Sequence, residues 1–203
     1  MQNPLITLNE ALRIGKGGTR ICYLHPDNPD IIIKVEKEGT PSHFTPNDWE
    51  YRHYTDIVRL HGRVPGIIPI LGTVDTQFGK GLMAKAIRDT DGALSPTLSH
   101  AALHPDRWEP SAIFSAVKDL TDRIITLDIR LFDFNLDNIL LQTTEKNQLQ
   151  AIIIDLKGHY ANCEWIPVSS WFDFLGRRKR NRRVRRLMES LSSVFNDKTA
   201  MPE

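Results

Sequence analysis

The sequence predicts an α+β fold with an antiparallel sheet in its first half and mostly helices in its second half. Short runs of β-branched and apolar residues alternate with turn residues up to about residue 88, as at residues 31–35. Helical spacing of apolar residues dominates later, most clearly over residues 112–127. A chain of 203 residues has room for one sizeable domain or for two packed parts.

The composition is that of an ordinary globular protein. Hydrophobic residues make up 40% of the chain and charged residues 25%, which argues against global disorder. No apolar run approaches the ~20 residues of a membrane span. Residues 1–5 lack the basic and apolar regions of a signal peptide, so a cytoplasmic location is expected. The two cysteines, Cys22 and Cys163, have no CxxC spacing, so we expect neither a disulfide framework nor a zinc site.

A glycine-rich turn at residues 15–19 is the first candidate for ligand binding. It contains Gly15, Gly17 and Gly18 and precedes a strand predicted over residues 20–24. Glycines allow positive φ and leave no Cβ between backbone N–H groups and a phosphate. The pattern matches neither the full G-x-G-x-x-G motif nor a Walker loop, so an ordinary hairpin turn is the alternative.

A lysine interrupts the apolar strand predicted over residues 31–35. If that strand is buried, Lys34 must extend to the surface or meet an anion. Residues 47–58 have helical spacing, with Asn47 as the expected N-cap. Glu50 in this helix is the acid that would pair with Lys34. The alternative is a surface lysine on an edge strand and a solvated helix acid.

Two further strands are predicted over residues 66–74 and 81–87. The first half then has five strands with one helix between the third and the fourth. The polar residues 88–92 connect it to the second half. Residues 94–110 are rich in proline and histidine, and we expect irregular structure there. Ser111 is expected to cap the amphipathic helix that follows.

Three polar residues stand among apolar ones in the second half. Residues 138–141 and 149–154 are predicted to form two short strands joined by a polar turn, which brings Asn138 and Asp155 to the same end of a hairpin. Their amide and carboxylate oxygens suit Mg²⁺ that carries phosphate oxygens. Asp133, five residues before the asparagine, could orient or deprotonate an attacking hydroxyl.

The spacing D-x-x-x-x-N, followed by three apolar residues and an aspartate, resembles the catalytic and metal loops of protein kinases. In length, order and motif placement the whole chain is similar to the PhoP regulatory network protein YrbL family of small bacterial kinase-like proteins. The resemblance implies a compact bilobal fold, with residues 1–88 as an antiparallel N-lobe and residues 89–203 as a shortened, mostly helical C-lobe. It also implies ATP and Mg²⁺ as cofactors and a regulatory setting linked to PhoP signalling.

The resemblance assigns roles to individual residues. Lys34 would hold the α and β phosphates next to the glycine turn, and the backbone near Ala86 would contact adenine. Asn138 and Asp155 would hold the metal ion. Asp133 would orient the acceptor hydroxyl.

The chain departs from the protein kinase pattern in several places. Leu131 and Phe132 replace His-Arg, and Asn135 stands where a lysine usually neutralises the γ-phosphate. Asp155-Leu-Lys-Gly replaces Asp-Phe-Gly, so Lys157 is a candidate for the missing charge. No Ala-Pro-Glu follows, and the D-x-N-x-x-N pattern also resembles bacterial lipopolysaccharide core sugar kinases. The acceptor hydroxyl is therefore left open between a protein and a sugar or other small molecule.

A basic run extends from Arg177 to Arg186 near the C-terminus. It holds 8 of the 26 lysines and arginines, which leaves 18 basic against 25 acidic residues elsewhere. The flanking Leu175, Leu187 and Leu191 predict a helix with one apolar face. Three roles are open: a solvated helix docked on the acidic body, a contact with nucleic-acid phosphates, or adhesion to an anionic membrane surface.

The leading hypothesis is an ATP- and Mg²⁺-dependent phosphotransferase. The alternative is a pseudokinase, a scaffold or regulator that binds nucleotide, or an anionic partner through its arginine-rich helix, or both. The altered loop residues favour the alternative, and the intact set of lysine, glutamate, asparagine and aspartates opposes it. A third hypothesis, nucleic-acid binding by the basic helix alone, leaves the acidic residues unexplained.

Overall fold

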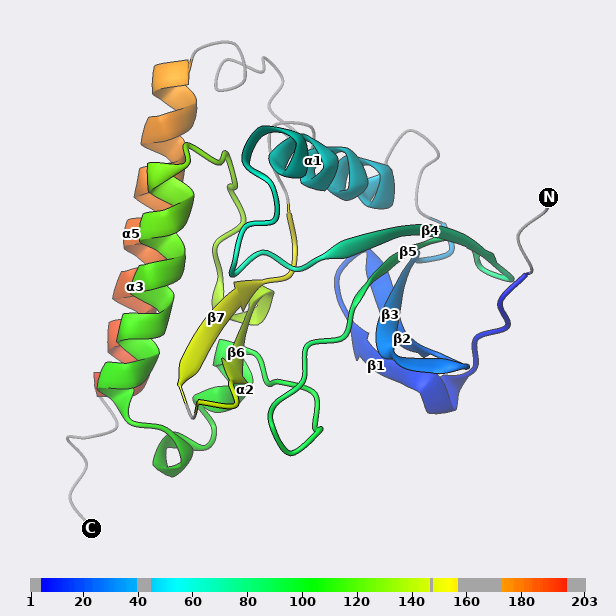
Figure 1. Cartoon of the computed structure of the whole chain (residues 1–203), viewed down its shortest axis with the longest axis horizontal. Helices are drawn as coiled ribbons and strands as arrows, with labels where there is room; N and C mark the ends of the chain where they lie inside the picture. Colours follow the sequence, from blue (N-terminus) through cyan, green and yellow to red (C-terminus); the bar gives the residue numbers. More distant parts are fainter. Residues whose placement is uncertain (1–4, 40–44, 147, 157–172, 197–203) are drawn as a thin grey trace.

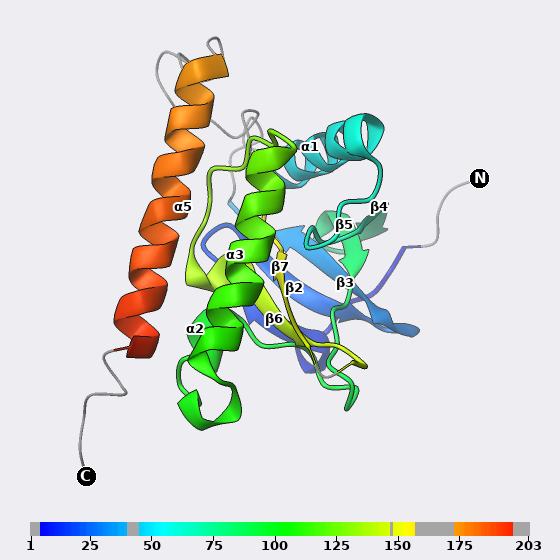
Figure 2. The ribbon, with the colours of Figure 1, turned by 60° about the vertical axis from the view of Figure 1, so that its left-hand side comes forward.

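The computed structural model describes residues 5–39, 45–146, 148–156 and 173–196. One antiparallel sheet of five strands lies on one side of the molecule, and the helices α3 and α5 stand side by side on the other (Figures 1 and 2). The predicted α+β class is confirmed. In sequence order the sheet consists of β1 (Arg13–Lys16), β2 (Arg20–His25), β3 (Asn28–Glu36), β4 (Ile70–Thr76) and β5 (Gly79–Lys85), arranged spatially as β1-β2-β3-β5-β4.

The central strand β3 has a different environment on each face. Ile33 and Val35 belong to a small apolar cluster on one side, whereas Ile32 belongs to the main core on the other. Lys34 shares the face of Ile32, since side chains alternate along a strand. A neighbouring glycine makes room for this packing, because a Cβ on Gly81 would lie 2.6 Å from a methyl group of Ile33.

The helix α1 (Pro46–His61) connects β3 to β4, as the sequence predicts. Asn47 is not its N-cap, which corrects the expectation above. Thr45 occupies that position and Pro46 begins the helix. The Asn47 side chain instead donates to the carbonyl oxygens of Lys34 at 3.0 Å and Lys80 at 3.3 Å. Two backbone acceptors in the sheet therefore hold this asparagine inside the first turn.

The second half contains three helices, two 3-10 turns and a hairpin among its described residues. Within the segment 94–110, which is otherwise mostly irregular as expected, α2 (Leu98–Ala101) forms one helical turn, and Thr97 caps it by accepting from the His100 N–H. Ser111 is not a cap, since α3 starts one residue earlier, at a proline. In sequence order the elements are α2 (Leu98–Ala101), η2 (Pro105–Arg107), α3 (Pro110–Thr126), η3 (Leu136–Asn138), β6 (Ile139–Thr143), β7 (Leu149–Ile153) and α5 (Asp173–Asn196).

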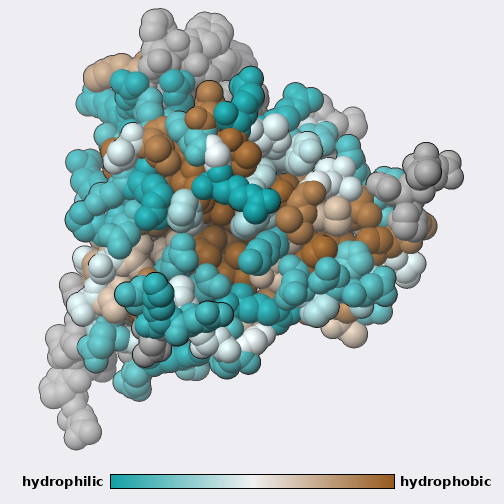
Figure 3. Space-filling view, viewed as in Figure 1, coloured by the Kyte–Doolittle hydropathy of each residue, from teal (hydrophilic) through white to brown (hydrophobic). Residues whose placement is uncertain are grey.

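The main core fills the space between the sheet, α3, α5 and the β6–β7 hairpin. Fully buried side chains from each element meet there, such as Leu82 of the sheet, Ile124 of α3, Ile153 of β7 and Leu191 of α5. Hydrophilic residues cover most of the face drawn in Figure 3, and hydrophobic ones show in its middle and over the sheet on the right. Within the described ranges, no helix combines the length and apolar character that a membrane crossing needs.

A short backbone pairing joins the sheet to the second half. The Ile153 N–H donates to the Gly66 carbonyl at 2.8 Å, and the Ile68 N–H donates back to Ile153 at 3.0 Å. This pairing uses residues 66–68, which is why β4 begins at Ile70 and not at residue 66. Gly66 has φ +88°, and a Cβ there would lie 2.7 Å from Leu120 Cδ1 and 3.2 Å from the Ala151 carbonyl oxygen.

A buried carboxylate fixes the segment that connects the two halves. Asp89 is 6% exposed and accepts from the Ser95 hydroxyl at 2.7 Å and from the Thr143 N–H at 2.9 Å. Its other oxygen accepts from Arg107 at 3.3 Å. The connection at residues 88–92 is therefore anchored to the hairpin and not a free linker.

The basic helix α5 docks through two of its own arginines. Asp128 accepts from Arg177 at 2.8 Å and from Arg180 at 2.8 Å, and Arg180 is only 3% exposed. Asp128 has φ +51°, a left-handed conformation that aspartate and asparagine tolerate better than most residues. Val184 and Leu187 confirm the predicted apolar face, since both are buried in the core.

We predict that Gly66→Ala destabilises the fold by about 2–4 kcal/mol, because backbone strain adds to overpacking against the Leu120 side chain and the Ala151 carbonyl. The matched control is Gly92→Ala, which has φ +84° but no atom within 4 Å of the new Cβ, and which should cost about 1 kcal/mol. Urea denaturation measures both. Equal losses would mean that the contact with Leu120 and Ala151 does not constrain the fold.

We predict that Asp128→Asn lowers the free energy of unfolding by about 1 kcal/mol at neutral pH, because Arg180 loses its carboxylate while the left-handed backbone is kept. The hydrogen bonds from Arg177 hold the pKa of Asp128 below its ordinary value, although burial opposes this. The ion pair therefore stabilises the protein above the unfolded pKa of about 4, and this contribution is lost as the pH falls through the lower folded pKa.

Thermal melts from pH 7 to pH 3 measure this effect. The gap between the wild type and Asp128→Asn should close at the acidic end. Asp122→Asn on α3 is the control, because Asp122 is exposed and pairs with Lys118 one turn away. A gap that persists unchanged at pH 3 would contradict an electrostatic role for Asp128.

Candidate functional site

A buried ion pair forms the centre of the candidate site. Lys34 Nζ lies 2.7 Å from Glu50 Oε1, and the two side chains are 4% and 2% exposed. β3 supplies the lysine from the middle of the sheet. Glu50 lies on the buried face of α1 together with Asn47, His53 and Ile57, at the spacing of one helix face. The sequence therefore placed both partners correctly, since the lysine needs an anion and the helix presents one.

Lys34 also reaches the second half of the chain. Its Nζ donates to the carbonyl oxygen of Ile154 at 2.6 Å, and Ile154 directly precedes Asp155. On the other side of the same segment, His53 Nδ1 lies 3.1 Å from the Leu156 carbonyl oxygen. Two side chains from the first half therefore hold the backbone on either side of Asp155.

Arg20 belongs to the site, and sequence reasoning missed it. Its Nη1 donates to the second oxygen of Glu50, as well as to Asn47 Oδ1 at 3.2 Å. Its Nη2 donates to Asp155 Oδ1 at 3.1 Å. Burial alone would lower the pKa of Arg20, but the carboxylates of Glu50 and Asp155 raise it above its ordinary value. The available signal was strand periodicity, because Cys22 lies opposite Lys34 and Arg20 is two residues from Cys22.

The β6–β7 hairpin brings Asn138 and Asp155 to the same end, as the sequence predicts. Ile139 pairs with Ile153, and the Ile154 N–H donates to the Asn138 carbonyl at 2.9 Å. Asn138 Nδ2 donates to the Asp133 carbonyl at 3.3 Å, which leaves its Oδ1 as the side-chain acceptor. The three residues of the predicted loop therefore lie within one connected segment.

Asn135 has a structural role in the loop that carries Asp133. Its Nδ2 donates to Asp133 Oδ1 at 2.9 Å. Its Oδ1 accepts from the N–H groups of Asp137 and Asn138, each at 3.0 Å, and so caps the 3-10 turn η3. The asparagine that stands in place of a lysine orders this loop without adding charge. From α5, Lys179 lies 4.7 Å from the centre of the Phe132 ring in the same loop.

The glycine turn differs in one respect from its sequence interpretation. None of Gly15, Gly17 and Gly18 has a positive φ, so backbone freedom is not the reason for these glycines. Gly15 belongs to β1, and the Gly17 N–H donates to the Arg20 carbonyl at 2.9 Å. A Cβ on Gly15 or Gly18 would meet no atom within 4 Å, so the glycines keep the outside of this turn open.

Two further residues were predicted to contact the nucleotide, Ala86 and Lys157. Ala86 is buried and follows β5, and its N–H donates to the Asp30 carbonyl at 2.8 Å. Its carbonyl oxygen is the group left at this residue for an adenine amino group. Lys157 lies outside the described residues, as does Cys163. Cys22 is half-buried, and burial raises the pKa of its thiol although Lys34 and Arg20 oppose the effect.

The donor set suits a cation that arrives with its own ligands. Asn138 and Asp155 offer an amide and a carboxylate oxygen, which are hard ligands of the kind that Mg²⁺ binds. In the described ranges, no group of three or more His, Cys, Asp or Glu side chains could hold a metal ion. The described residues therefore supply too few ligands for a closed metal site, but enough for Mg²⁺ bound to phosphate oxygens and water.

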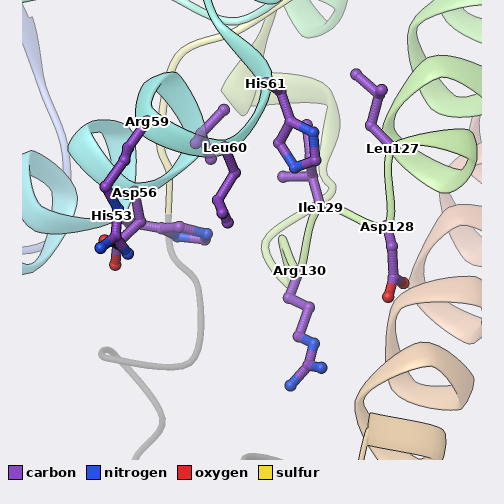
Figure 4. Close-up of a pocket in the computed structure, with 10 residues that line it drawn as sticks. His53, Asp56, Arg59, Leu60, His61, Leu127, Asp128, Ile129 and Arg130 are labelled. Carbon is purple, nitrogen blue, oxygen red and sulfur yellow. Dashed lines mark hydrogen bonds and ion pairs between the residues drawn. The ribbon is translucent and has the colours of Figure 1, made fainter.

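Two pockets lie beside the charged cluster and not within it. A pocket of about 370 Å³ is bordered by the end of α1, including His53 and His61, and by the segment from Leu127 to Arg130 (Figure 4). The other, of about 640 Å³, lies between Arg88 and the β6–β7 turn. Lys34, Asp133 and Asp155 line neither pocket. The second pocket borders the segment expected to contact adenine.

Comparison with known proteins identifies the family that this chain matches. The family described as "PhoP regulatory network protein YrbL" matches residues 6–192 of the chain. The chain is 26% identical over 191 residues to "Uncharacterized protein YrbL" of Escherichia coli (strain K12), which covers 91% of this chain and 87% of that protein. A protein of the same name from Shigella flexneri gives the same values. The match spans every element of the candidate site.

Proposed function

The chain belongs to the PhoP regulatory network protein YrbL family, and from the geometry of its site we propose that it is a kinase-like phosphotransferase dependent on ATP and Mg²⁺. The observation that carries the proposal is the linkage from Glu50 through Lys34 to the backbone next to Asp155. Such a linkage is what the protein kinase template requires, with a strand lysine held by a helix glutamate next to a metal-binding aspartate.

The arrangement of elements supports the same proposal. A five-stranded sheet with a helix after its third strand precedes a segment at residues 86–89 and then a mostly helical part. We propose that residues 1–88 and 89–203 are the two lobes of a kinase-like protein. The anchored carboxylate of Asp89 would fix their relative orientation.

In the proposed reaction, the γ-phosphoryl group passes from ATP to an acceptor oxygen, and the bond to the β-phosphate oxygen breaks to leave ADP. Lys34 binds phosphate oxygens, with Gly15, Gly17 and Gly18 on the open turn beside them. Asn138 and Asp155 would hold Mg²⁺, which would neutralise phosphate charge. Asp133 orients the acceptor hydroxyl and accepts its proton, and Asn135 holds this carboxylate in position.

The acceptor is a hydroxyl group on a protein, a sugar or another small molecule. The family name, which refers to the PhoP regulatory network, supports a proposed regulatory setting linked to PhoP. Lys157 remains the candidate for a positive charge near the γ-phosphate.

A second candidate function is a pseudokinase scaffold whose basic helix binds an anionic partner. The specific observation in its favour is the outer face of α5, where Arg178, Arg182, Arg183, Arg185 and Arg186 are all exposed. Among the described residues, only Arg185 of these five has an acidic neighbour within ion-pair distance, Glu189. Such a row of guanidinium groups suits nucleic-acid phosphates or anionic lipid headgroups.

We predict that Asp133→Asn and Asp155→Asn each reduce transfer from γ-labelled ATP by at least ~100-fold, because one removes the proton acceptor and the other a metal ligand. The assay uses purified protein with Mg²⁺, alone and with cell lysate. Asp137→Asn is the matched control, since Asp137 is exposed on the same loop. Asp133→Asn should retain ATP binding.

Lys34→Met should lose transfer to a similar extent, whereas Lys85→Met on the neighbouring strand should not, because Lys85 is exposed. Transfer that survives in all three site variants would place the activity elsewhere. No transfer by the wild type, with ATP bound equally well by Asp133→Asn, would replace the phosphotransferase with the scaffold.

For the second candidate, we predict that a triple variant with Arg182, Arg183 and Arg186 changed to glutamate abolishes binding to an anionic partner. Duplex DNA and phosphatidylglycerol vesicles are the two probes, and binding of the wild type should weaken steeply between 50 and 200 mM salt, by roughly tenfold or more. The control changes three exposed lysines elsewhere to glutamate, namely Lys80, Lys85 and Lys146. Equal binding by both triple variants would exclude α5 as the contact surface.

A further inference from the structure

The position of the Arg20 side chain in the candidate site needs an explanation. Its guanidinium lies between the carboxylates of Glu50 and Asp155, and the residue is 8% exposed. We propose that Arg20 is a built-in cation that competes with a divalent metal ion for Asp155 and binds the nucleotide phosphates once it has released that carboxylate. This proposal rests on the proposed function, and it names a residue that neither the template nor the family description assigns.

The position of Arg20 is fixed from its backbone outward. It is the first residue of β2, directly after the glycine turn, and its carbonyl accepts from the Gly17 N–H at 2.9 Å. Nη1 is held by Glu50 and by Asn47 on α1, both in the first half of the chain. Only Nη2 reaches the second half, at Asp155. Arg20 can therefore give up Asp155 and keep its other contacts.

The charges of the cluster explain why Arg20 would release Asp155 and not Glu50. Arg20 and Lys34 balance Glu50 and Asp155, so the four groups together are neutral. Glu50 keeps a lysine at 2.7 Å whatever Arg20 does. At the half-buried Asp155, a metal ion and the guanidinium would require the same carboxylate, and two cations at such short range repel one another. A nucleotide phosphate provides the released Nη2 with a new anion.

The proposal predicts opposite effects on two ligands. Arg20→Gln should raise the affinity of the nucleotide-free protein for Mn²⁺ by about tenfold or more, because the competitor is gone. The same change should lower the affinity for ATP in EDTA by about tenfold, because a phosphate-binding cation is gone. A residue that merely supported the fold would weaken both.

Electron paramagnetic resonance of free Mn²⁺ and calorimetry with ATP in EDTA measure the two affinities. Arg13→Gln is the matched control, because it removes one positive charge from the neighbouring strand, where Arg13 is exposed and pairs with Glu10. It should change neither affinity by more than about twofold. In the double variant with Arg20→Gln and Asp155→Asn, the gain in Mn²⁺ affinity should disappear.

Arg20→Lys is the variant to test if Arg20→Gln does not fold. A lysine keeps the charge but presents a single ammonium group, which cannot span both carboxylates, so Mn²⁺ affinity should rise and ATP affinity in EDTA should stay within about threefold of the wild type. Unchanged or weaker Mn²⁺ binding in every folded Arg20 variant would overturn the proposal. If label transfer is nevertheless observed, the phosphotransferase stands without it, whereas absence of Mn²⁺ and ATP binding in the wild type and all variants would overturn both.

Discussion

The structure depends on a network of four charges, three of them buried and one half-buried, that no single element could keep. Lys34 and Arg20 stand on adjacent strands, Glu50 on α1 and Asp155 at the end of the hairpin. An unpaired charge at any of these positions would cost several kcal/mol. Because each charge needs oppositely charged partners on other elements, the ion pairs hold these elements together. The network aligns the sheet, the helix and the hairpin at one point, which is also the point where chemistry is proposed.

Two other features limit how the network can open. The pairing of Gly66 with Ile153 joins the first half to the hairpin, and the buried Asp89 anchors the connecting segment to the same hairpin. Rigid connections near a charged site allow small changes, such as the exchange of one guanidinium contact, without separation of the halves. The carboxylates of the site thus stay in place while their cationic partners exchange. Such fixed carboxylates preorganise the site for a highly charged ligand.

The sequence predicted those parts of the site that depend on local pattern. The interruption of an apolar strand identified Lys34, helical spacing identified Glu50, and the predicted hairpin identified Asn138 with Asp155. Arg20 was not predictable in the same way, because its partners lie 30 and 135 residues away. Asn47 was assigned to a cap, since an asparagine at a helix start usually caps it, but carbonyl groups of the sheet compete for its side chain. Polar contacts between residues far apart in the sequence leave no local periodic pattern from which they could be predicted.

The two candidate functions differ in how they use the same charges. In α5, Arg180 and Lys179 face inward, toward Asp128 and the Phe132 ring, while other arginines face outward. The helix therefore contacts the loop that carries Asp133 and presents a basic surface at the same time. An anionic partner on that surface would lie on the helix whose inner face packs against the loop. A scaffold that only binds an anionic partner does not need Asp133 held by Asn135 or Lys34 held by Glu50, and this arrangement favours the proposed phosphotransferase.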